Sequence, residues 1–222
     1  MISVILNSYN PTQWQTHMTM ACLAAIRKFT EPPYELIVVD NAPKYRIRDD
    51  YHVLEPYTLI ENKKNQTAYY SYHQGAKRAK GDKLVFIQSD VFCHEGTINK
   101  LVKYLDEFDV AFPQQVPLSR GDVEKIYKVK DGKPTEIGWR DAGMIAITKD
   151  AYERCGGWDG RFKNLLGEKA FYIRWDRAGL DWTDKTNAFI THIMAGNNLS
   201  KTPELYEKQM TYDAELIKKE YE

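Results

Sequence analysis

Short apolar runs alternate with segments of helical spacing along this chain. Runs of β-branched and aliphatic residues, typical of strands buried on both faces, lie at 2–6, 35–40, 57–61, 84–88 and 144–148, with shorter ones at 110–113 and 188–192. Apolar residues recur at three- and four-residue spacing over 16–29, 67–79, 97–108, 150–154, 167–178 and 203–222. This order predicts an α/β fold with a mixed, mostly parallel central sheet flanked by helices.

Two segments of the second half add to this outline. Asp131-Gly132 lies between strand-like runs at 124–129 and 135–139, which predicts a hairpin turn. The segment 203–222 is a highly charged, amphipathic C-terminal helix. We expect its apolar stripe to pack on its own domain. The stripe could instead pack on a second copy of the chain, so both a monomer and a homodimer stay open. That stripe consists of Leu205, Met210, Ala214 and Ile217.

Composition narrows the class of protein. A chain of 222 residues suits one domain, here 1–222, and 31 basic against 31 acidic residues give a formal net charge of zero. This balance argues against a strongly basic nucleic-acid or membrane binder. Three widely spaced cysteines without a CxxC pair argue against a zinc site or a disulfide framework. The first residues do not resemble a signal peptide and no run is long enough to span a membrane, so we expect a cytoplasmic protein.

Polar residues follow four of the predicted strands. In parallel sheets, ligands bind beyond the carboxyl ends of the strands, so these residues are the first candidates for chemistry. Asp90 follows the most apolar strand and has the carboxylate that a hard divalent cation prefers. Capping of the next turn is the structural alternative for such an aspartate. The four polar clusters are Asn7–Asn10, Asp40-Asn41, Asn62–Thr67 and Ser89-Asp90.

Four blocks of sequence carry a resemblance to a known family. They are ISVILNSYN followed by ELIVVDN, then AKGDKLVFIQSDV, DAGMIAITKDAYERCGGWDGRF and GEKAFYIRWDRAG. In this order they resemble the family 2 glycosyltransferases, over most of residues 1–197. The resemblance implies the GT-A fold, a nucleotide-sugar donor, a divalent cation and inverting transfer to an acceptor hydroxyl. It also implies a nucleotide-sugar-binding half at 1–112, an acceptor-binding half at 113–200 and a C-terminal helix at 201–222.

The resemblance assigns the donor and metal residues. Asp90 falls on the last Asp of the family's metal motif, and His192 falls where members often carry a histidine that completes the metal shell. Gln88 stands where the first Asp of that motif is usual, and its amide can hydrogen-bond a ribose or base. Each remaining donor residue has a turn-forming or solvated-loop alternative. These donor-binding candidates are Ser8, Tyr9, Asp40, Asn41, Asn65 and Ser89.

The same resemblance assigns the acceptor side. Glu168 takes the second position of the family's Glu-Asp pair and would be the general base, whereas Gly167 replaces the first acid. An ordinary glutamate at a helix N-terminus is the structural alternative. The acceptor-binding candidates are Trp139, Asp141, Trp158 and Asp159.

The donor, cation and acceptor are less defined. Mn²⁺ or Mg²⁺ fits the carboxylate, and a UDP-sugar is the default donor, with dTDP- and GDP-sugars open. A glycan, a protein side chain or another hydroxyl compound would accept the sugar, and the zero net charge disfavours a nucleic-acid acceptor. One alternative is a weak or inactive member that only binds nucleotide or glycan. A nucleotidyltransferase is disfavoured, because NSYNPTQW lacks a Gly-rich loop with a basic residue.

Overall fold

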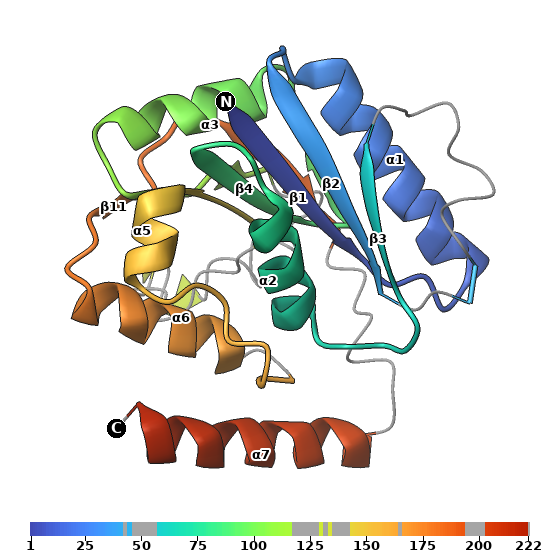
Figure 1. The fold of residues 1–222 in the computed structure, drawn as a ribbon, viewed down its shortest axis with the longest axis vertical. Helices are drawn as coiled ribbons and strands as arrows, with labels where there is room; N and C mark the ends of the chain where they lie inside the picture. Colours follow the sequence, from blue (N-terminus) through green and yellow to red (C-terminus); the bar gives the residue numbers. More distant parts are fainter. Residues whose placement is uncertain are drawn as a thin grey trace.

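A seven-stranded sheet is the centre of the fold (Figure 1). The computed structural model describes residues 1–41, 44–45, 57–116, 129–130, 133–134, 143–163, 166–193 and 203–221. The strand order is β11-β6-β10-β4-β1-β2-β3. The bounds are β1 Ile2–Ser8, β2 Tyr34–Asn41, β3 Thr58–Asn62, β4 Lys83–Gln88, β6 Val110–Ala111, β10 Met144–Thr148 and β11 Trp182–Thr183.

The sheet is mixed but mostly parallel, as predicted. β1 pairs in parallel with β2 and with β4, and β2 pairs in parallel with β3. β10 lies between β4 and β6 and runs antiparallel to both. The carboxyl ends of β1, β2, β3 and β4 therefore share one edge of the sheet, where the polar clusters follow the strands.

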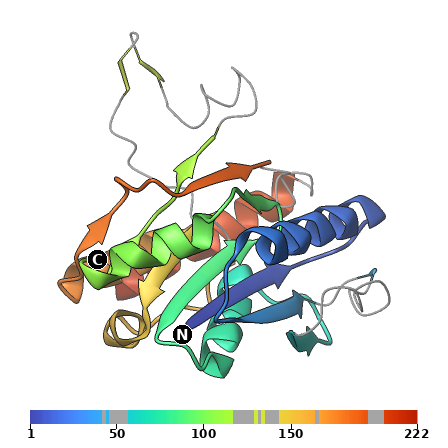
Figure 2. The same ribbon diagram turned by 90° about the horizontal axis from the view of Figure 1, so that it is seen from above.

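Helices cover both faces of the sheet (Figures 1 and 2). Their bounds are α1 Gln13–Phe29, α2 Ala68–Arg78, α3 Thr97–Lys103, α5 Lys149–Arg154, α6 Leu166–Arg177 and α7 Pro203–Glu220. α1 and α3 pack on one face, whereas α2, α5, α6 and α7 contribute to the core on the other. The helix predicted over 97–108 ends earlier, because a 3-10 turn at Tyr104–Asp106 tightens its last part.

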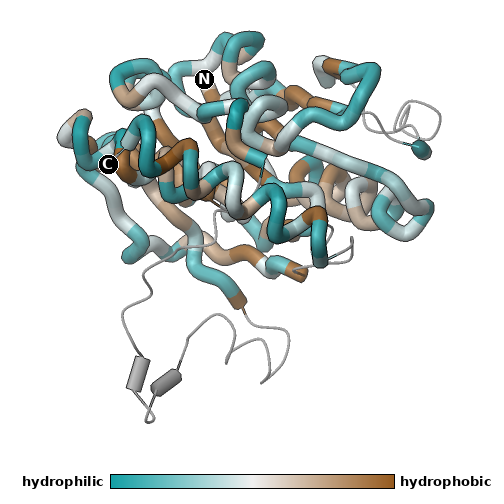
Figure 3. Tube along the Cα trace, turned by 90° about the horizontal axis from the view of Figure 1, so that it is seen from below, coloured by the Kyte–Doolittle hydropathy of each residue, from teal (hydrophilic) through white to brown (hydrophobic). Residues whose placement is uncertain are grey.

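Alternation along the strands separates the two cores. In β1, Ile5 faces the α2 side, while Val4 and Leu6 face the α1 side. α2 packs very close to β1 at Gly75. A Cβ on this glycine would come within 2.3 Å of Ile5 Cγ2. Figure 3 shows apolar stretches concentrated inside the molecule and polar ones along the outer turns of the helices.

Two smaller sheets complete the described strands. β12 (Phe189–His192) pairs antiparallel with β5 (Val91–Cys93) and parallel with β7 (Gln114–Gln115). The strand predicted at 188–192 therefore belongs to a separate sheet. β8 (Val129–Lys130) and β9 (Lys133–Pro134) form an antiparallel pair around the predicted hairpin turn, whose own residues lie outside the described chain.

The C-terminal helix packs through a different stripe from the one predicted. Asp213 and Ile217 are buried in α7, whereas Ala214 is exposed and Leu205 is 43% exposed. The prediction was therefore wrong for Leu205 and Ala214 and right for Ile217. Among the described residues, no helix combines the length and the apolar character that crossing a membrane requires.

All three cysteines are free and buried. Burial raises the pKa of the Cys93 thiol to about 12. Burial, followed by the nearby Cys93 and Asp90, raises the pKa of Cys22 well above its ordinary value. The raised pKa values leave these buried thiols protonated near neutral pH.

Candidate functional site

Asp90 and His192 meet beyond the carboxyl end of β4. β4 ends at Gln88, a turn carries Asp90, and β5 then pairs with β12 so that His192 lies opposite Val91. The His192 Nε2 atom is 3.3 Å from Asp90 Oδ1, and the two side chains are only 4% and 15% exposed. The N–H of Ile193 donates to the Asp90 carbonyl at 3.1 Å, which fixes the turn against β12. The structure thus brings together the two residues predicted to bind metal.

Gly143 makes room for this pair. A Cβ at Gly143 would come within 2.9 Å of His192 Nδ1 and 3.1 Å of Val91 Cγ2. The Gly143 carbonyl also accepts from the N–H of Gln88 at 2.9 Å. The backbone at Gly143, just before β10, therefore packs directly against the His192 ring. Only glycine fits at this position without movement of its neighbours.

Ser8 and Asp40 lie together at the ends of β1 and β2. The Ser8 hydroxyl donates to Asp40 Oδ1 at 3.1 Å, and both residues are fully buried. Because β1 and β2 are paired in register there, Ser8 stands directly opposite Asp40. Neither side chain has any exposed surface in this structure. Their predicted contact with a nucleotide therefore stays a prediction.

Asn41 is the centre of an amide network. Its Nδ2 group donates to Asn65 Oδ1 and to the Gln66 carbonyl, both at 2.9 Å. Its Oδ1 atom accepts from the Gln66 N–H at 2.8 Å and from Asn62 Nδ2 at 3.3 Å. Asn62 and Gln74 exchange a further pair of hydrogen bonds. Since these contacts use both donors and both acceptor sites of the Asn41 amide, this side chain holds the 62–67 loop in place.

The remaining donor candidates border the same strand ends. Gln88, Ser89 and Tyr9 are each half-buried, so part of each side chain reaches the surface. The Gln88 carbonyl accepts a weak bond from the Cys22 thiol at 3.6 Å, which helps to fix the end of β4. Asn65 is exposed, with its Oδ1 held by Asn41.

Glu168 lies in the first turn of α6 and is only 7% exposed. The ring of Tyr69, from α2, covers the preceding residue so closely that a Cβ on Gly167 would come within 2.3 Å of it. A side chain therefore has no room at residue 167 unless Tyr69 moves. Burial, then the charges of Glu168 and Asp213, raises the pKa of the Tyr69 phenol well above its usual value.

Trp158 is a core residue rather than a surface platform. It is 2% exposed, and its ring packs against Tyr69 (centroids 5.4 Å apart), Tyr72 (5.5 Å), Phe86 (5.8 Å) and Phe171 (3.9 Å). Such contacts among aromatic rings stabilise a core beyond the burial of their area. This predicted acceptor residue is therefore packed in the core, where its ring contacts aromatic residues of α2 and α6.

Asp159 is similarly occupied. Its carboxylate accepts from the backbone and guanidinium of Arg161, at 2.7 to 3.1 Å, and from the Tyr221 hydroxyl at 2.9 Å. Burial opposes its ionisation, but the hydrogen bonds from Arg161 and Tyr221 outweigh burial and hold the pKa of Asp159 below its ordinary value. Asp159 thus ties the chain before α6 to α7, and its contact with an acceptor stays a prediction. Trp139 and Asp141 lie outside the described residues.

A cation would find two protein ligands at the end of β4. Over the described parts of the chain, no group of three or more His, Cys, Asp and Glu side chains converges on a metal position. Asp90 supplies a carboxylate oxygen and His192 an imidazole nitrogen, a set that suits Mn²⁺ when a ligand such as a diphosphate contributes further oxygens. The residues present therefore fit a cation that is bound jointly with its nucleotide.

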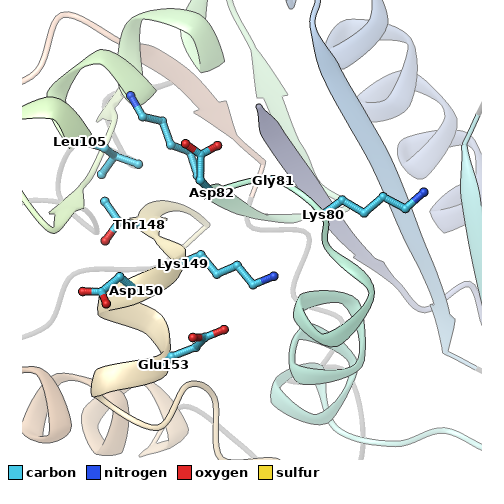
Figure 4. Close-up of a pocket in the computed structure, with 9 residues that line it drawn as sticks. Lys80, Gly81, Asp82, Leu105, Thr148, Lys149, Asp150 and Glu153 are labelled. Atoms are coloured by element: carbon cyan, nitrogen blue, oxygen red, sulfur yellow. The ribbon is translucent and has the colours of Figure 1, made fainter.

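A separate hollow of about 560 Å³ lies at the opposite edge of the sheet (Figure 4). Its lining includes Lys83 at the start of β4 and Lys149 after the end of β10. Lys83 is bound to Asp106 at 2.5 Å, and Lys149 donates to the Ala79 carbonyl at 3.0 Å. Both cations are therefore already engaged, and the hollow is away from the strand ends that carry Asp90.

Comparison with known sequences identifies the family. The sequence model described as Glycosyl transferase family 2 matches residues 3–168. This chain belongs to glycosyl transferase family 2. The curated relative "Uncharacterized glycosyltransferase" from Haemophilus influenzae is 34% identical over 90 residues, which are 40% of this chain and 29% of that protein.

Solved structures of glycosyltransferases share the fold. Mannosyltransferase PcManGT from Pyrobaculum calidifontis, in complex with GDP-Man and Mn²⁺, has a TM-score of 0.66 at 15% identity, over 89% of this chain and 58% of that chain. Residues 1–349 of S. aureus TarS give 0.59 at 17% identity, over 86% of this chain and 57% of that one. These likenesses confirm the GT-A fold that the family resemblance implied. The chain spans less than two thirds of each of these proteins.

Three residues of the site were missed by the sequence reasoning. Gly143 precedes a buried strand, and a glycine in that place is a signal for close approach of another group. Asp213 follows Met210 by three residues and precedes Ile217 by four, so helical spacing already placed it in the apolar stripe. Tyr69 carried no signal, because its contact with Gly167 joins two helices about a hundred residues apart.

Proposed function

We propose that this protein transfers a sugar from a nucleoside-diphosphate donor to an acceptor hydroxyl with inversion of configuration. The observation that carries the proposal is the Asp90–His192 pair, 3.3 Å apart beyond the end of the central strand β4. The family and the fold make glycosyl transfer the expected chemistry, and this pair supports placing the reaction beyond the end of β4.

The donor would lie across the carboxyl ends of β1, β2 and β4. Asp90 and His192 would hold Mn²⁺ or Mg²⁺, which would supply Lewis-acid stabilisation of the departing diphosphate. Gln88, Ser89 and Tyr9 reach the surface beside them and are the candidates for contacts with the nucleotide. A UDP-sugar is the default donor; the bound GDP-Man of the Pyrobaculum mannosyltransferase makes a GDP-sugar the first alternative to test.

Glu168 would be the general base. Glu168 is only 7% exposed in the first turn of α6, so the surrounding packing limits the positions that its carboxylate can take. A base that removes the acceptor proton needs such restriction. The acceptor oxygen then attacks the anomeric carbon from the face opposite the diphosphate, so the configuration inverts. The proton moves to Glu168 and the nucleoside diphosphate leaves.

The metal-dependent part of the proposal is tested by calorimetry. UDP and GDP are titrated into the wild-type protein with and without Mn²⁺, and into Asp90→Asn. The wild type should bind a nucleoside diphosphate more tightly with Mn²⁺, and Asp90→Asn should lose that increment, because an amide lacks the charge of the carboxylate. Asp106→Asn, an exposed aspartate remote from the site, is the matched control. Equal affinity with and without Mn²⁺ in the wild type would overturn the metal assignment.

The transfer itself is tested with a donor panel. UDP-glucose, UDP-N-acetylglucosamine, GDP-mannose and dTDP-rhamnose are incubated with the protein and Mn²⁺, and release of nucleoside diphosphate is followed, with water as the acceptor. Release from one donor by the wild type supports the proposal. A protein that binds nucleotide and releases none from any donor supports the alternative of a binding-only family member.

A further inference from the structure

Helix α7 carries a carboxylate in the middle of its buried face. Asp213 is fully buried, and the stripe that contains it continues with Ile217 and Tyr221, which belong to the core. A charged group in such a place is costly unless polar groups compensate it. Both Asp213 oxygens accept from the backbone N–H of Lys163, at 2.9 and 3.2 Å. Packing alone would favour an apolar residue here, so the carboxylate points to another role.

The backbone that Asp213 holds leads into the helix that carries Glu168. Lys163 lies three residues before Leu166, the first residue of α6, and Glu168 is in the first turn of that helix. α7 also grips the same segment near its other end, because the Arg161 guanidinium pairs with Glu220 at 2.8 Å. α7 therefore holds the backbone and side chains of the segment that ends at Lys163, shortly before α6 begins.

Asp213 and Glu168 also act on one side chain. Tyr69, which packs over Gly167, lies near both carboxylates, and their charges raise the pKa of its phenol beyond the effect of burial. α2 and α7 thus both contribute groups to the surroundings of Glu168. Figure 1 shows α7 lying below α2 and α6.

We propose that Asp213 is a positioning residue for Glu168. By fixing the backbone at Lys163 it sets the start of α6 and hence the direction of the Glu168 carboxylate. The inference rests on the proposed function, in which Glu168 accepts the proton of the acceptor. A misplacement of a catalytic group by about 1 Å can reduce a rate by about 10²-fold, so a contact of this kind has a measurable effect.

Two substitutions separate positioning from packing. Asp213→Asn keeps the shape and one acceptor oxygen, whereas Asp213→Leu keeps the size and removes the acceptor. Glu215→Gln, at an exposed position of the same helix, is the matched control. Turnover is measured as nucleoside diphosphate released from UDP-glucose and GDP-mannose with Mn²⁺. It is divided by the number of nucleotide sites found by calorimetry with UDP or GDP, which removes any unfolded fraction.

The expected order of turnover per site is wild type, Asp213→Asn, Asp213→Leu, with the leucine variant down by about tenfold to a hundredfold. Its Tm should be lower than that of the wild type, because the Lys163 N–H loses its acceptor, and dividing turnover by the number of nucleotide sites removes this effect from the comparison. Glu215→Gln should match the wild type within about twofold. Should the leucine variant fail to fold, the normalised turnover of Asp213→Asn decides. Wild-type turnover per site in both variants would overturn the inference alone. A wild type that binds nucleotide but turns over no donor would overturn the proposed function, and the inference with it.

Discussion

The proposed donor side, around Asp90 and His192, and the proposed base side, around Glu168, are built in different ways. Asp90 and His192 are placed by backbone pairing, since each lies at or just beyond a strand end and β5 pairs with β12 between them. Glu168 is placed by side chains from distant helices, among them Tyr69 of α2 and Asp213 of α7. The first arrangement depends on hydrogen-bond register, and the second depends on packing across the chain.

This difference teaches where each half is vulnerable. Positions fixed by backbone pairing tolerate most side-chain changes. They are disturbed where an added side chain would clash, as a Cβ on Gly143 would with the His192 ring. The packed cluster has one such point as well, at Gly167, where the Tyr69 ring leaves no room for a Cβ. Substitutions in the two regions should therefore have different effects.

The largest effect is expected for Glu168→Gln. The amide has the shape of the carboxylate but cannot accept the acceptor proton, so turnover should fall by about 10²–10⁴-fold. Affinity for UDP or GDP with Mn²⁺ should stay within about twofold, because the donor side does not depend on this residue. Release of nucleoside diphosphate and calorimetry measure the two quantities. Glu153→Gln on α5 is the control, and a normal rate in Glu168→Gln would remove it from the role of base.

Trp158→Ala should lower the free energy of unfolding by about 3–5 kcal/mol, because it leaves a cavity among four packed rings. Urea denaturation measures the change. Trp14→Ala is the matched control, since Trp14 is 52% exposed and its loss should cost less than about 0.5 kcal/mol. A small effect at Trp158 would mean that the cluster does not hold the base side together.

Gly143→Ala should disturb the donor side without unfolding it. The added Cβ would press on the His192 ring and move it from Asp90, which should weaken Mn²⁺-dependent binding of UDP or GDP by about 10–100-fold. His192→Ala should have a similar effect, and the double variant should be no worse than either single one, because both act through the same contact. Full additivity in calorimetry would contradict this. His94→Ala, an exposed histidine that contacts β12 through Thr191, serves as control.

The smallest effect concerns acid. The folded-state pKa of Asp159 lies below that of an unfolded aspartate, so its stabilising contribution is present above the unfolded pKa of about 3.9 and is lost as pH falls through the folded value. Thermal unfolding from pH 6 to pH 3 should therefore show a shallower loss of Tm in Asp159→Asn than in the wild type. Asp150→Asn, an 80% exposed partner of Arg154, should keep the wild-type slope. Parallel curves for wild type and Asp159→Asn would contradict the prediction.

Sequence alone predicted the strands of the central sheet well. Apolar runs such as 84–88 and 144–148 match β4 and β10 within a residue, because a strand buried on both faces leaves a continuous apolar signal. As the apolar pattern predicted, Asp90 lies just beyond the carboxyl end of β4. The pairing of Asp90 with His192 followed from the family resemblance and not from spacing, since about a hundred residues separate them.

The base half was predicted less well for a physical reason. Trp158 and Asp159 read as acceptor contacts, yet one is packed in the core and the other binds Arg161 and Tyr221. Asp213 is not part of the predicted apolar stripe, yet it is fully buried in α7. Contacts between helices remote in sequence leave no periodic trace, so they appear only in the folded chain.

The three protonated core thiols make α7 open to direct observation. Alkylating reagents attack the thiolate, and burial leaves Cys22, Cys93 and Cys155 in the unreactive form. A cysteine introduced at the exposed Lys208 would then be the one site that takes a fluorescent label rapidly, with no need to remove the native residues. Its emission would show in real time whether α7 stays packed on the domain or moves away from it during the proposed sugar transfer.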